Sequence, residues 1–123
     1  MKKLLLIIIL MLCVSCAYAG KQYQVIKEFK GYPSSSTTQT EVFYPSTSQW
    51  AVGYAFQVYK EDYTMGCIFV IEKKSNKCVF MTFINGTCNK IDYIYVLDPA
   101  GYYLNIISSN MFYYIAIYNI TET

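Results

Sequence analysis

The sequence predicts an all-β protein: an antiparallel β-sandwich or jelly roll of about eight short strands, after a cleaved N-terminal signal peptide. Aromatic residues form 18% of the 123-residue chain, and they suit the half-buried surface of a sheet. Large and small side chains alternate over 50–59. Turn signals recur at close spacing, and no amphipathic helical pattern follows residue 19. A small closed barrel is the architectural alternative, because periodicity does not show whether a sheet closes.

The first nineteen residues have the pattern of a secretory signal peptide. Lys2 and Lys3 precede an apolar run over 4–14, and Ala17 and Ala19 supply the small residues before a cleavage site. A transmembrane helix needs about 20 apolar residues, so this run is too short for a permanent anchor. We expect cleavage after Ala19, which leaves one domain over 20–123 and no membrane-spanning segment in the mature chain.

A lipoprotein signal is the alternative at the same place. Cys16 follows Val14 and Ser15, as the lipidated cysteine follows small residues in such signals, although Cys13 stands where Leu is usual. Acyl chains on Cys16 would hold the domain at a membrane surface. Both alternatives place the protein outside the cell or on its surface.

The charge of the mature chain argues against nucleic acid as a partner. Ten Lys and no Arg face eight acidic residues, and removing Lys2 and Lys3 leaves eight of each sign. Without arginine the chain lacks the side chain that best contacts phosphates and guanine. We therefore expect no nucleic-acid binding.

The N-terminal third predicts two strands and one loop. Apolar residues at Tyr23, Val25, Ile26 and Phe29 predict an irregular strand over 22–29. The Ser/Thr stretch 34–38 predicts an exposed loop. An extended pattern over 39–44 predicts a second strand, which ends before Pro45.

The clearest strand is predicted over 50–59. Five large side chains share one face there, namely Trp50, Val52, Tyr54, Phe56 and Val58. The opposite face carries Ala51, Gly53 and Ala55 and is thin enough for a loop, another backbone or a ligand to approach. We expect the large face to enter the core.

Five further strands are predicted in the C-terminal half, over 67–72, 78–84, 91–97, 102–107 and 112–120. The polar turn 73–77 makes the first two a hairpin, and 108–110 joins the last two. Asn85-Gly86 tolerates the positive φ angles of a type I′ turn, and Asp98-Pro99 marks another turn.

Three cysteines remain after cleavage, Cys67, Cys78 and Cys88, which predicts one disulfide and one spare thiol in an oxidising compartment. We favour Cys78 with Cys88, although the odd count leaves the pairing open. The spare thiol is expected to be a small buried hydrophobe, or else a point of intermolecular attachment.

No catalytic constellation is present in the sequence. The chain has no His, which excludes Ser-His-Asp and Cys-His catalysis and histidine metal sites. Glu61-Asp62 has the pattern of a solvated turn, and a carboxylate pair from distant residues, such as Glu41 and Asp92, is visible only in a structure. We expect a protein that is not an enzyme and carries no cofactor or metal.

The candidate contact and modification residues lie in turns and loops. Tyr59, Tyr63 and the stretch 34–38 are the expected ligand contacts, because tyrosine offers a large contact area at low entropic cost. Asn85 and Asn119 begin Asn-x-Thr triplets, which are N-glycosylation acceptors in a eukaryotic secretory pathway. At Asn85 the turn explains the sequence without a glycan.

The strand pattern resembles small exported CUB-like and prepeptidase-C-terminal-like β-sandwich modules. The resemblance rests on Trp50-x-Val52-x-Tyr54-x-Phe56, Phe69-Val70-Ile71, Gly101-x-Tyr103-Leu104-Asn105-Ile106 and Tyr114-x-Ala116-Ile117, over about the last 75 residues. It implies a noncatalytic recognition domain. The acidic calcium site of some CUB domains has no counterpart in this sequence.

Export, an aromatic β scaffold and the lack of catalytic groups predict an exported noncatalytic binding module that recognises an extracellular protein or glycan. The alternative is a structural or envelope protein, anchored by lipid at Cys16 or joined to neighbours through a free cysteine. A secreted enzyme inhibitor is a third hypothesis. The sequence does not fix the oligomeric state.

Overall fold

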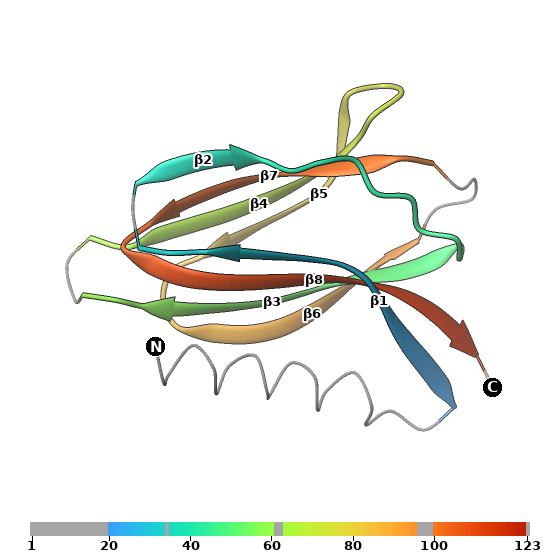
Figure 1. Ribbon diagram of the computed structural model, residues 1–123, viewed down its shortest axis with the longest axis horizontal. Coiled ribbons are helices and arrows are strands. Elements are labelled where there is room, and N and C mark those ends of the chain that lie inside the picture. The colour runs from blue at the N-terminus through green and yellow to red at the C-terminus, as the bar shows by residue number, and fades with distance from the viewer. Residues whose placement is uncertain (1–19, 34, 61–62, 96–99, 123) are drawn as a thin grey trace.

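The computed structural model describes residues 20–33, 35–60, 63–95 and 100–122, and over them the chain forms eight strands in two antiparallel sheets (Figure 1). The strands are β1 (Lys21–Gly31), β2 (Ser36–Gln39), β3 (Gln49–Val58), β4 (Met65–Glu72), β5 (Lys77–Ile84), β6 (Cys88–Tyr95), β7 (Tyr102–Ser109) and β8 (Met111–Glu122). This confirms the all-β, two-sheet prediction. None of these described residues forms a helix with the length and hydrophobicity of a membrane span. The expected signal peptide and Cys16 lie outside the described residues.

Each sheet holds four strands, in the orders β1-β8-β3-β6 and β2-β7-β4-β5. The β4–β5 hairpin stays within one sheet, and its turn contains Asn76 with φ of 54°, a conformation that asparagine tolerates. Every other step between consecutive strands passes from one sheet to the other, namely β1–β2, β2–β3, β3–β4, β5–β6, β6–β7 and β7–β8. The two sheets are therefore linked by six connections, and β1, β6, β2 and β5 are left as edge strands.

The alternation in β3 produces the predicted core. Trp50, Val52, Tyr54 and Phe56 are buried between the sheets. They meet inward residues of β4, β7 and β8, namely Ile68, Val70, Tyr102, Leu104, Ile106, Tyr113, Ile115 and Ile117. Because every second residue of a strand points the same way, this single face supplies the centre of the core.

The thin face of β3 takes part in a second cluster. Ala51 and Ala55 are fully buried among Tyr114, Tyr118 and Ile120 of β8. Tyr23 of β1 packs edge-on against Tyr118, with ring centroids 6.0 Å apart. Bulky tyrosines on neighbouring strands thus occupy the space that the alanines leave.

A β-bulge explains the irregular pattern of the first strand. Val25 pairs with Tyr118 and Lys27 with Ile117, so Ile26 is the extra residue. Val25 packs in the second cluster, with Ala51 and Tyr118, whereas Ile26 and Phe29 pack against the core between the sheets. The bulge lets adjacent apolar residues serve opposite faces of the sheet.

The predictions for 34–38 and 39–44 were wrong. Ser36–Gln39 forms β2, which pairs with β7, and residue 34 is not described. Over the rest of the predicted strand, 40–44, Phe43 alone pairs, through an isolated bridge to Tyr102. The reason is that β2 is an edge strand with all four residues exposed, so it buries no side chain that would produce an apolar alternation.

The predicted type I′ turn at Asn85-Gly86 was also wrong. Among the described residues positive φ angles occur at Gly20, Asn76 and Asn110, not at this pair. β5 and β6 belong to different sheets, so Asn85–Thr87 makes a crossover between sheets. Such a connection does not require the twist of a two-residue hairpin turn.

Candidate functional site: an aromatic cluster at one end of the sandwich

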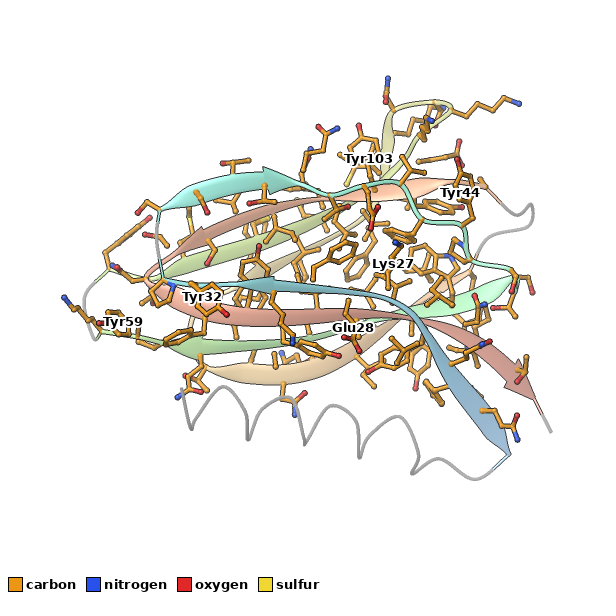
Figure 2. All side chains as sticks on the ribbon, in the orientation of Figure 1. Lys27, Glu28, Tyr32, Tyr44, Tyr59 and Tyr103 are labelled. Atoms are coloured by element: carbon orange, nitrogen blue, oxygen red, sulfur yellow. The ribbon has the colours of Figure 1, made fainter. Side chains whose placement is uncertain are left out.

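Three rings from three elements gather where β1 and β3 end and β8 begins. Phe112 lies at the centre, 6.3 Å from Tyr32 and 5.7 Å from Tyr59 between ring centroids, with both pairs edge-to-face. Figure 2 shows Tyr32 and Tyr59 at the same end of the molecule. Tyr32 is 60% exposed and Tyr59 is 54% exposed, whereas Phe112 is partly buried. We call Tyr32, Tyr59, Tyr63 and Phe112 the aromatic end.

Asn110 holds the loops of the aromatic end in place. Its backbone has φ of 58°, and its carbonyl accepts a 2.9 Å hydrogen bond from the Tyr59 amide. Its side-chain amide donates a 2.8 Å bond to the Tyr63 carbonyl. One residue of the β7–β8 turn therefore fixes both ends of the β3–β4 connection.

Polar groups lie on the connections that carry the rings and on residues next to them. Lys60 Nζ lies 5.5 Å from the centroid of Tyr59, and Ser35 and Ser109 share a 3.1 Å hydroxyl hydrogen bond. Tyr63, 73% exposed, contacts the Met65 sulfur through its hydroxyl at 3.7 Å. Exposed ring faces beside hydroxyl donors can stack on the apolar face of a sugar or pack against a protein.

The structure places Tyr59 and Tyr63, the expected contacts, on the same connection. Sequence reasoning missed Tyr32 and Phe112. The pairing of Gly31 with Tyr113 brings these two together, and the Tyr113 ring occupies the space that a side chain at Gly31 would fill. A pattern along one strand gives no sign of such a register between distant strands.

The three cysteines of the described chain are free, so the expected Cys78–Cys88 bridge is not formed. Cys78 lies exposed on β5 and Cys88 lies on β6 in the other sheet. Burial raises the pKa of the Cys67 and Cys88 thiols. A raised pKa makes the reactive thiolate scarce at neutral pH.

An open cavity of about 330 Å³ lies beside the β5–β6 crossover. Tyr54, Phe83, Cys88 and Lys90 contribute to its lining. The Tyr54 hydroxyl donates a 2.6 Å hydrogen bond to Asp92. The cavity is thus lined by the Tyr54 phenol, which is hydrogen-bonded to the Asp92 carboxylate, and by the Cys88 thiol, whose pKa is raised.

The acidic residues considered for catalysis have separate partners. Glu41 pairs with Lys27 at 2.6 Å, whereas Asp92 accepts from Tyr54. Glu61-Asp62 lies outside the described residues. Over the part of the chain that the structure describes, no three His, Cys, Asp or Glu side chains gather as metal ligands.

The two glycosylation triplets have different surroundings. Asn119 is only 7% exposed; its amide donates to the Ser46 hydroxyl at 2.7 Å and its carbonyl accepts from the Ser46 backbone at 3.0 Å. Asn85 is exposed in the crossover. The folded chain therefore has room for a glycan at Asn85 and none at Asn119.

Expression through a eukaryotic secretory pathway is expected to add a glycan at Asn85 and to leave Asn119 unmodified. Intact-mass analysis of the wild-type chain, Asn85→Gln and Thr121→Val checks this expectation. The glycan mass should disappear in Asn85→Gln and persist in Thr121→Val, which removes the other triplet without touching the Asn119 amide. A glycan that persists in Asn85→Gln would contradict the assignment.

No family model and no curated protein matches the chain. Three chains of solved structures match it. One of these comes from work on Bacillus titled "Bacillus endospore appendages form a novel family of disulfide-linked pili", with 12% identity, 84% of this chain and 95% of that chain covered, and a TM-score of 0.45. No CUB or prepeptidase-C-terminal family matches, so of the expectation drawn from that resemblance only the two-sheet β architecture is present.

Proposed function

We propose that the protein is an exported, noncatalytic binding module that recognises an extracellular protein or glycan through the aromatic end. The observation that carries this proposal is the exposure of Tyr32 and Tyr59 on either side of Phe112. Isolated exposed tyrosines are common. Rings that are held edge-to-face on anchored loops form a preorganised contact surface, because less side-chain entropy is lost when a ligand binds. The lack of histidine and the raised pKa of the Cys88 thiol support a role without chemistry.

Tyr59→Ala is expected to lower affinity for the ligand about tenfold, or about 1.4 kcal/mol, because tyrosines that a partner covers are enriched among the residues that contribute most to binding. Glycan arrays and surface pull-downs with the secreted chain identify the ligand, and titration of that ligand measures the change. Tyr44→Ala is the matched control, since Tyr44 is 66% exposed and lies away from Tyr59 (Figure 2). Absence of any ligand above background, or equal losses in both variants, would count against the proposal.

A structural or envelope protein is the second candidate. The exposed Cys78 thiol favours it, because such a thiol can join neighbouring chains in an oxidising compartment. Intact-mass analysis of the native product separates the candidates. A mass that begins at Gly20, with no lipid and no intermolecular disulfide, would remove both attachments of the structural candidate.

A further inference from the structure

The outer side of β5 carries apolar side chains with unusual exposure. Val79 is 42% exposed, Met81 48% and Phe83 70%. Met81 lies opposite the partly buried Phe69 on β4, so the apolar surface continues onto the neighbouring strand there, whereas Cys67, opposite Phe83, is buried. An exposed apolar surface of this kind marks a contact site in a soluble protein.

β5 is also an edge strand without the usual protection. It is last in the order β2-β7-β4-β5, so one side of its backbone has no neighbouring strand in the described sheet. From Cys78 to Ile84 it contains no charge and no proline, which are the common devices against edge pairing. Its bulge falls at Val79, where the pairing shifts, and the stretch 80–84 is regular.

The other edges are less suited to pairing. β1 carries Lys27, Glu28 and Lys30, β6 carries Lys90 and Asp92, and β2 has only four residues. A charge on an edge strand opposes the approach of a second strand. The uncharged, regular edge of this molecule is thus β5.

We propose that β5 pairs antiparallel with β5 of a second copy of this chain, about a two-fold axis at Thr82. This register uses only the regular stretch 80–84. Met81 then lies opposite Phe83 of the second copy, and Phe80 lies opposite Ile84 of the second copy. Both copies use the same residues, as in every two-fold symmetric interface. The β2-β7-β4-β5 sheet of one copy then continues into the same sheet of the second copy.

The charges near β5 favour this antiparallel arrangement. Lys73, Lys74 and Lys77 gather at its hairpin end. The axis at Thr82 places the two copies of Lys77 beyond opposite ends of the paired stretch 80–84, about 33 Å apart along the strand direction. Like charges of the two copies are therefore kept apart, whereas a parallel pair would bring the lysines together.

Sedimentation equilibrium of the full chain, expressed through a secretory pathway, tests the proposal. We expect a reversible dimer that Phe83→Lys weakens at least about tenfold, since a charge replaces the apolar contact with Met81 of the second copy. Tyr44→Lys is the control, because Tyr44 is equally exposed but lies on the β2–β3 connection. A wild-type monomer up to the solubility limit, or equal dissociation in both variants, would overturn the proposal.

Disulfide trapping tests the axis. With the axis at Thr82, a cysteine at this position lies opposite the same cysteine of the second copy, close enough to form a disulfide. Cys78 of the two copies is about 27 Å apart in this register. In a Cys78→Ser background, Thr82→Cys is expected to give a covalent dimer under mild oxidation, and the wild-type chain is expected to give none through Cys78. The opposite result would overturn the axis at Thr82. Circular dichroism confirms that each variant keeps its sheet content.

Discussion

Replacing Trp50 by alanine is expected to lower the free energy of unfolding by about 3–5 kcal/mol. Trp50 is fully buried, and its ring centroid lies 5.0 Å from Tyr102 and 5.5 Å from Phe43. Alanine would leave a cavity beside two rings that are held by β7 and by the backbone bridge between Phe43 and Tyr102, so the site cannot collapse easily. Since a domain of this size is stable by about 5–15 kcal/mol, the variant would retain little stability. Urea denaturation followed by circular dichroism measures the loss.

Phenylalanine at the same position is the informative control. The Trp50 indole nitrogen is buried, and among the described residues it has no hydrogen-bond partner. Phe keeps a ring in the site and removes this unpaired donor, whose burial costs about 1–3 kcal/mol. We expect Trp50→Phe to lose much less stability than Trp50→Ala. Equal losses in the two variants would show that the ring contacts with Tyr102 and Phe43 are not what Trp50 contributes.

The same residues show why β3 was predictable. A strand buried on one face must repeat apolar residues with a period of two, and Trp50, Val52, Tyr54 and Phe56 do so without interruption. β2 was not predictable for the converse reason. Its Ser and Thr side chains are all exposed, and its place is fixed by backbone pairing to β7, which any residue except proline can make.

The candidate site was half predictable. Tyr59 and Tyr63 could be singled out because they flank a turn after a strong strand, where a side chain is rarely needed for the core. Tyr32 and Phe112 join them only through the register of β1 on β8, which pairs Gly31 with Tyr113. Residues eighty positions apart become neighbours through that pairing, and one sequence carries no local record of it. The missing disulfide between Cys78 and Cys88 was unpredictable for the same reason. The two cysteines are free because β5 and β6 belong to different sheets, which the sequence does not reveal.

Alkaline pH is expected to unfold the protein through its buried tyrosines. Burial, with the hydrogen bond to Asp92 adding to it, raises the pKa of Tyr54 from 10.0 to about 12. Burial also raises the pKa of Tyr102 and Tyr113, and burial together with Glu28 raises that of Tyr114. The folded state thus holds these protons more tightly than the unfolded chain. Stability is present in full below about pH 10 and is lost as pH rises from there toward 12.

Tyr54 alone accounts for on the order of 2–3 kcal/mol of that loss, since each unit of pKa difference corresponds to about 1.4 kcal/mol. Urea denaturation at a series of pH values from about 9 to 12 gives the slope. Tyr54→Phe removes one titrating group, so its stability should fall less steeply with pH, although its stability at neutral pH drops by about 1 kcal/mol with the lost Asp92 hydrogen bond. Parallel slopes for Tyr54→Phe and the wild-type chain would mean that Tyr54 titrates as in the unfolded chain. Because its hydroxyl donates to Asp92 in the cavity beside the β5–β6 crossover, that outcome would also show that this hydrogen bond does not hold the phenol proton.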